Sequence, residues 1–187
     1  PSHEIVHQAL EIVVKMDHRG AVGADPLAGD GAGILIQIPD KFLRKEFADL
    51  GVMMPEKGDY AVGMVFLPRD SELREASIAA VNKVTEDEGQ VVLGWRDVPV
   101  DKSVLGESVK QTEPVIKQVL IGRGTGTADT DAFDRKLYVI RKQSHHVMWD
   151  TNETAWQDFY MPSLSSRTIV FKGMVLAGNL AKYYRDF

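Results

Sequence analysis

The chain has 187 residues, of which 44% are hydrophobic and 26% charged, and this composition is typical of one globular domain, or of one domain with a large insertion. Its formal net charge of −5 argues against a nucleic-acid partner, because phosphate binding needs clustered lysine and arginine. No apolar run approaches the roughly 20 residues that span a bilayer, and no signal segment opens the chain, so we expect a cytoplasmic protein with no membrane partner.

The first fifty residues predict a helix, a glycine-rich turn, a strand and a second helix. Ser2 is a typical N-cap, and apolar residues at three- and four-residue steps predict a helix over about residues 3–17 with one buried face. Five glycines and one proline within residues 20–33 indicate a close backbone approach rather than a solvated linker. Residues 34–38 then predict a strand, and residues 39–50 a short helix.

The middle of the chain predicts a small α+β unit. Its elements are strands at 61–67 and 90–96, an amphipathic helix over 71–88, a third short element at 114–120 and a fourth at 136–141. Asp70 is placed to cap the helix. This β-α-β-β order suggests a ferredoxin-like unit, and we predict that residues 55–143 form an insertion.

The last part of the chain has weaker patterns. We expect a surface loop at 121–128, an irregular polar segment at 144–156, a strand at 166–172 and a helix at 173–184. The adjacent His145 and His146 are predicted to be solvent-facing loop residues, because neighbouring residues on a regular element point to different faces and no third histidine stands at a helical step from them. We therefore predict no metal site.

Two blocks of sequence carry a resemblance to a known family. The first runs from Met16 through His-Arg-Gly-Ala to Gly-Asp-Gly-Ala-Gly-Ile, and the second is Phe159-Tyr-Met-Pro-Ser-Leu-Ser-Ser-Arg-Thr-Ile-Val-Phe-Lys-Gly-Met174. Through essentially its whole length the chain resembles the type 2 glutamine amidotransferase (glutaminase) domain of the glutamate synthase large chain. The resemblance implies an α+β fold, a partial N-terminal nucleophile hydrolase αββα sandwich. Residues 1–54 would form its front, 55–143 the ferredoxin-like insertion and 144–187 its return.

The resemblance also implies a chemistry. A cysteine thiolate attacks the side-chain amide of L-glutamine and releases ammonia, which a synthase domain of the same parent chain uses to make glutamate from 2-oxoglutarate. That cysteine would lie about a dozen residues before Pro1 as the first residue of the mature protein. A carboxylate-binding arginine and an oxyanion-hole Asn-Gly pair would follow Phe187. We therefore expect the isolated chain to be inactive.

The cofactors implied by the resemblance belong to the parent enzyme. The parent is expected to use FMN and an iron–sulfur cluster, with a small reductase subunit or ferredoxin as a further partner. No cofactor is expected in this chain, because it contains no cysteine to ligate a cluster.

Arg19 is the predicted catalytic residue. From the pattern alone a structural role is favoured, either pairing with a carboxylate or capping carbonyls at a helix C-terminus. In the resembling family, however, the arginine of His-Arg-Gly sits beside the N-terminal cysteine, where a cation favours the thiolate and stabilises the negative tetrahedral intermediate. His18, Gly20, Ser165 and Arg167 are predicted to support the substrate pocket.

The residues by themselves leave two other functions open. The chain could be a small-molecule-binding, regulatory or interface module without catalysis, in which residues 55–143 act as a sensor or contact the synthase domain. It could also be an amidotransferase of asparagine or amidophosphoribosyl synthesis, although those usually have Gln or Pro at the position of Ala21 and lack the block at 159–174. If the chain is part of a glutaminase, Arg19 should face a vacant pocket. If Arg19 instead forms a buried ion pair that faces away from the pocket, the binding module is favoured.

Overall fold

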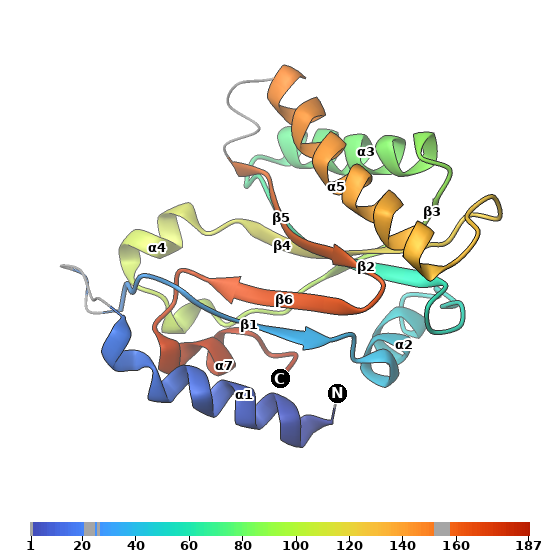
Figure 1. Ribbon diagram of the computed structural model, residues 1–187. Coiled ribbons are helices and arrows are strands. Elements are labelled where there is room, and N and C mark those ends of the chain that lie inside the picture. Colours follow the sequence, from blue (N-terminus) through green and yellow to red (C-terminus); the bar gives the residue numbers. More distant parts are fainter. Residues whose placement is uncertain (1, 21–24, 26, 152–157) are drawn as a thin grey trace. The chain divides into compact units, whose positions relative to one another are not determined.

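A computed structural model of the protein describes residues 2–20, 25, 27–151 and 158–187 (Figure 1). These residues form two compact units, each assembled from separate stretches of the chain. The first unit comprises Pro1–Gln37, Val98–Glu113 and Val170–Phe187, and the second comprises Ile38–Asp97 and Pro114–Ile169. None of the helices in the described ranges is long and apolar enough to cross a membrane.

The first unit is built on a two-stranded sheet of β1 and β6. Its helices are short apart from α1, which packs against β1. The elements are α1 (His3–Lys15), the 3-10 turn η1 (Asp17–Arg19), β1 (Ala32–Gln37), η2 (Lys102–Val104), α4 (Glu107–Thr112), β6 (Thr168–Gly173), η3 (Ala177–Asn179) and α7 (Leu180–Tyr183). β6 begins in the second unit and enters the first at Val170.

Helix α1 begins as its sequence predicts but buries less than expected. The hydroxyl of Ser2 accepts the backbone N–H of Ile5 at 3.3 Å, which confirms the N-cap. Val6 is the one buried residue of the helix, while Ile5 and Ile12 are 57% and 58% exposed. The expectation of a wholly buried apolar face is therefore wrong for this structure, because within the described residues α1 packs mainly against β1 and η3, which cover little of it.

The second unit is a four-stranded sheet with two long helices. Its elements are α2 (Asp40–Ala48), β2 (Tyr60–Leu67), α3 (Ser71–Asp87), β3 (Val91–Asp97), β4 (Val115–Gly122), α5 (Thr130–Thr151) and β5 (Tyr160–Ser165). The strands lie in the order β3-β4-β2-β5, and every neighbouring pair is antiparallel. Val62 of the central strand β2 faces Leu120 on one side and Ser165 on the other. Helices α3 and α5 lie side by side (Figure 1).

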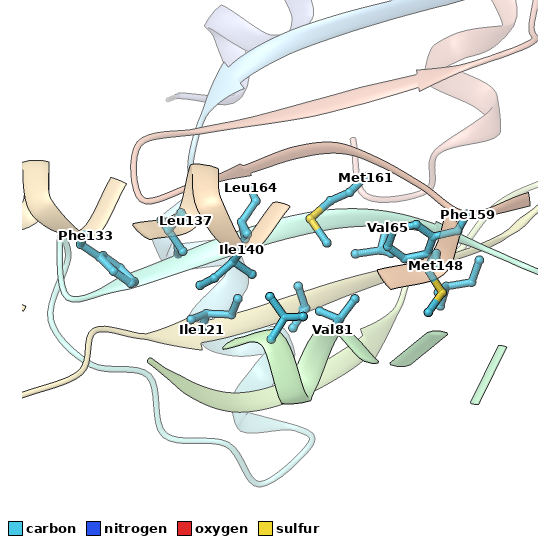
Figure 2. Close-up of a cluster of buried hydrophobic side chains, with 14 residues drawn as sticks. Val65, Val81, Ile121, Phe133, Leu137, Ile140, Met148, Phe159, Met161 and Leu164 are labelled. Atoms are coloured by element: carbon cyan, nitrogen blue, oxygen red, sulfur yellow. The ribbon is translucent and has the colours of Figure 1, made fainter. Parts of the chain in front are cut away.

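The core of the second unit lies between its sheet and the helices α3 and α5 (Figure 2). The buried cluster includes Val65 from β2, Val81 from α3, Ile121 from β4, Phe133, Leu137, Ile140 and Met148 from α5, and Met161 and Leu164 from β5. Full burial of one such side chain contributes about 1.5–3 kcal/mol. The core therefore holds the segments of this unit together although they are distant in the sequence.

One predicted element has the wrong secondary structure. Lys136–Arg141, expected as the fourth element of a β-α-β-β order, lies within the 22-residue helix α5. Phe133, Leu137 and Ile140 are all buried, at four- and three-residue steps that place them on one helix face, whereas Tyr138 is 60% exposed. A run of four apolar residues such as residues 137–140 is ambiguous between helix and strand, and packing on the sheet selects the helix.

Two smaller expectations also change. Helix α5 continues through His145 and His146, so these are helical residues rather than loop residues; residues 152–156 of the predicted irregular segment lie outside the described part. The predicted helix at 173–184 is a 3-10 turn followed by the four-residue helix α7. The strand β5, which precedes the predicted strand at 166–172, was missed.

Candidate functional site

A pocket of about 300 Å³ lies in the first unit where β1 begins. Its lining comes from three stretches of the chain. The C-terminal part of α1 and the turn after it contribute Val13, Met16, Asp17 and Gly20, the strand entry contributes residues 29–33, and the segment after β6 contributes residues 175–177. Apart from Val13, the lining residues of the first two stretches belong to the first sequence block that carried the family resemblance.

Glycine at the strand entry lets backbone lie directly against backbone. A Cβ built on Gly33 would lie 2.8 Å from both the carbonyl oxygen of Phe171 and the Cβ of Lys172. A Cβ on Gly29 would lie 2.9 Å from a methyl group of Leu176. The expected close backbone approach is confirmed, and the approaching segment is β6 together with the residues that follow it.

Arg19 is the last residue of η1, between two residues that line the pocket. Asp17 and Gly20 both contribute to the lining, and the backbone N–H of Gly20 donates to the carbonyl of Asp17 at 3.0 Å, which closes the turn. The side chain of Arg19 lies outside the described part of the structure, so its catalytic role stays a prediction. Its backbone lies in the turn between the lining residues Asp17 and Gly20.

His18 has a structural bond next to the same turn. Its ring Nδ1 donates to the carbonyl oxygen of Lys15 at 3.0 Å, and the side chain is exposed. This bond satisfies one of the carbonyls left without a partner at the end of α1. Its predicted support of the pocket would therefore act through the geometry of the turn that leads to Arg19.

Ser165 and Arg167 belong to the second unit, and neither is among the residues that line the pocket. The hydroxyl of Ser165 accepts the backbone N–H of Arg167 at 3.0 Å and shapes the turn after β5. Arg167 pairs with Asp131 and, at 3.2 Å, with Asp134, both in the first turns of α5. The hydrogen bond to Asp131 raises the pKa of the arginine. The predicted pocket role of Ser165 and Arg167 stays a prediction.

The sequence analysis did not predict one wall of the pocket, nor a hydrogen bond between Asp25 and Ser108. Residues 175–177 line the pocket although the second family block ends one residue earlier, at Met174. The carboxylate of Asp25 accepts a hydrogen bond from Ser108, 83 positions away. No local signal predicts a partner at that separation.

The two histidines of α5 do not form a metal centre in the described residues, where no group of three or more His, Cys, Asp or Glu side chains could hold an ion. The ring of His145 is half-buried and packs edge-on against Phe159, with centroids 5.3 Å apart. Burial, together with the neighbouring Arg141 and Lys142, lowers the pKa of His145. A neutral imidazole inside the packed unit is the expected state at neutral pH.

Comparison with known proteins identifies the family. All of residues 1–187 match the family model of class-II glutamine amidotransferases. The large chain of the NADPH glutamate synthase of Bacillus subtilis is 45% identical over 99% of this chain, which covers 12% of that protein. The NADH glutamate synthase of Schizosaccharomyces pombe is 40% identical over 99% of this chain and 9% of its own length.

A ferredoxin-dependent glutamate synthase of Synechocystis is 41% identical over the whole of this chain and 11% of its own length. The chain thus spans about a tenth of the length of these relatives, all of which are enzymes. The resemblance drawn from the two sequence blocks is confirmed. Glutamate synthase large chains contain an amidotransferase domain, and this chain corresponds to a part of it. The chain belongs to the class-II glutamine amidotransferases.

Proposed function

We propose that this chain supplies one part of a glutaminase site that hydrolyses L-glutamine to glutamate and ammonia, for glutamate synthesis from 2-oxoglutarate in a longer parent protein. The observation that carries the proposal is the pocket at the end of α1, with Asp17 and Gly20 in its lining on either side of Arg19. The family match over the whole chain supports assigning this pocket to glutamine chemistry.

In the proposed reaction a cysteine thiolate outside residues 1–187 attacks the side-chain amide carbon of glutamine. The carbon–nitrogen bond breaks as the leaving nitrogen takes a proton from the α-amino group of that cysteine. Ammonia leaves, and water then hydrolyses the thioester, which releases glutamate and restores the thiol. Arg19 provides a fixed positive charge that favours the thiolate and stabilises the oxyanion. Because these residues include no cysteine, the isolated chain is expected to be inactive.

For the fold we propose a partial N-terminal nucleophile hydrolase sandwich interrupted by a ferredoxin-like unit. The chain order β2-α3-β3-β4-α5-β5, with the sheet order β3-β4-β2-β5, supports the ferredoxin-like part. The proposed insertion, residues 55–143, supplies most of these elements, and β5 completes the sheet. Pairing of β1 with β6 supports one common layer for the strands that the first and last parts of the chain contribute, Ala32–Gln37 and Thr168–Gly173.

The proposed cofactors and partners lie outside this chain. FMN and an iron–sulfur cluster are proposed for the parent, but the residues present do not fit a cluster, because none supplies a thiolate. No step is therefore assigned to either group here. L-glutamine is the proposed substrate, and the proposed partners are the synthase domain of the parent and a reductase subunit or ferredoxin.

The experiment that tests the proposal is ammonia release from L-glutamine. It compares the 187-residue chain with the longer parent polypeptide, and it compares Arg19→Ala in the parent with Arg135→Ala, an exposed arginine of α5. We expect activity only in the parent, reduced by Arg19→Ala by about 100-fold, in line with the loss of an oxyanion-stabilising group, and unchanged by Arg135→Ala. A folded parent without glutaminase activity would contradict the proposal.

A further inference from the structure

One segment of the chain is hydrogen-bonded to both of the segments that supply two walls of the pocket. Val98–Glu113 lies between β3 and β4 in the sequence, yet it belongs to the first unit. It carries η2 and α4 and is bonded to both the glycine-rich strand entry and the C-terminal segment. We call this segment the bracket.

The contact of the bracket with the strand entry is made by Asp25. One carboxylate oxygen of Asp25 accepts the backbone N–H of Leu27 at 3.0 Å. The other accepts the hydroxyl of Ser108 at 2.9 Å and its backbone N–H at 3.4 Å. Asp25 thus caps α4 with a side chain from another part of the sequence, in place of the cap that Gly106 cannot supply.

Gly106 leaves room for this carboxylate. A Cβ at Gly106 would overlap the carboxylate of Asp25, so any larger residue would displace it. The hydrogen bonds from Leu27 and Ser108 also lower the pKa of Asp25, so the group is an ionised acceptor at neutral pH. Both observations show that the carboxylate of Asp25 fits closely against the start of α4.

The bond at Asp25 fixes the start of one pocket wall. The carbonyl of Asp25 accepts the N–H of Ala28 at 3.0 Å, directly before the lining glycine Gly29. Residues 29–33 then line the pocket and pair into β1. Movement of Asp25 would therefore be transmitted along a short arm, residues 27–33, to the pocket itself.

The bracket is also bonded to the C-terminal segment, which supplies another wall of the pocket. The amide Nδ2 of Asn179 donates to the carbonyl of Val104 at 3.2 Å. The hydroxyl of Tyr183 donates to the buried carboxylate of Glu113 at 2.8 Å, and Lys102 pairs with the second oxygen of the same carboxylate at 2.7 Å. The bonds of Asn179 and Tyr183 tie the segment that follows the lining residues 175–177 to the bracket, whereas the pair of Lys102 with Glu113 lies within the bracket.

We propose that Asp25 is a positioning residue of the glutaminase pocket, whose carboxylate fastens the wall formed by residues 29–33 to the bracket, which is also bonded to the segment that follows the lining residues 175–177. The proposal rests on the proposed function for the identity of the reaction. Asp25 does not line the pocket and its oxygens already accept three hydrogen bonds, so it acts on geometry rather than on the substrate.

The test uses the full parent polypeptide with the single variants Asp25→Ala and Ser108→Ala and the double variant. Ser103→Ala is the matched control, because Ser103 lies in the same bracket and donates to the carboxylate of Asp101 at 2.6 Å, away from the arm. Ser108→Thr keeps the hydroxyl and is the rescue variant. Steady-state kinetics with L-glutamine and amide hydrogen exchange of residues 27–33 are measured on each protein.

We expect Asp25→Ala and Ser108→Ala to lower kcat/KM by about tenfold or more, since small displacements of a positioned site are costly. The double variant should lose no more than Asp25→Ala alone, because both changes break one contact. Ser103→Ala should stay within about twofold of the wild type, and Ser108→Thr should recover most of the activity. Amides of residues 27–33 should exchange faster only in the variants that break the Asp25 contact.

Unchanged kinetics and exchange in Asp25→Ala, or an equal loss in Ser103→Ala, would overturn the positioning role. A wild-type parent that does not hydrolyse glutamine would instead refute the proposed function. The exchange measurement still decides the role of Asp25 in that case, because unchanged protection of residues 27–33 in Asp25→Ala would show that the contact holds nothing in place.

Discussion

Replacing Gly33 with alanine tests the backbone contact that forms the pocket wall. The new methyl group would lie 2.8 Å from the carbonyl oxygen of Phe171 and from the Cβ of Lys172. Neither atom is the end of a flexible side chain, so the strands must move apart, and such overpacking typically costs about 1–3 kcal/mol.

The matched control is Gly178→Ala in η3, where a Cβ meets nothing within 4 Å. Each Gly→Ala change also gains about 0.4–1 kcal/mol by restricting the unfolded chain. This gain is common to both variants and cancels in their difference. The free energy of unfolding of Gly33→Ala should therefore lie about 1–3 kcal/mol below that of Gly178→Ala.

The assay is urea unfolding of the 187-residue chain followed by circular dichroism, with the slope m compared between variants. An equal m is required before the free energies of unfolding are subtracted, because the chain has two compact units. If Gly33→Ala is as stable as Gly178→Ala, the close approach of β1 to β6 is wrong, and the pocket wall derived from it is wrong as well.

Two further predictions concern helix α5. Leu137→Ala should lower the free energy of unfolding by about 2–5 kcal/mol, because Leu137 is fully buried, whereas Tyr138→Ala should cost less than about 1 kcal/mol. Equal losses in urea unfolding would contradict the helical phase of this segment. His145 has a folded-state pKa below its unfolded value, so its neutral form stabilises the fold above about pH 6.5 and this stabilisation is lost as the pH falls. The melting temperature of His145→Gln should therefore fall less than that of the wild type between about pH 7.5 and 5.5, and identical falls would refute this linkage.

Much of the local structure could be predicted because its causes lie within a few residues. The cap at Ser2 and the cap at Asp70, whose carboxylate accepts the N–H of Leu73, each depend on a contact three positions along the chain. The strand predicted at 34–38 and the strand predicted at 61–67 are both found, shifted by one or two residues at the ends. Two blocks of residues were also sufficient to indicate the family, which the comparisons show.

The tertiary structure decided what depends on distant partners. The run of residues 137–140 is apolar enough for a strand or a helix, and only packing against the sheet selects α5. The pocket combines the end of α1 with residues 175–177, and the contact of Asp25 with Ser108 spans 83 positions. Periodicity and capping are properties of short windows, whereas a pocket wall depends on the path of the whole chain. For that reason the sequence by itself determined many of the local elements and the family, and the fold determined the remaining elements and which residues meet at the site.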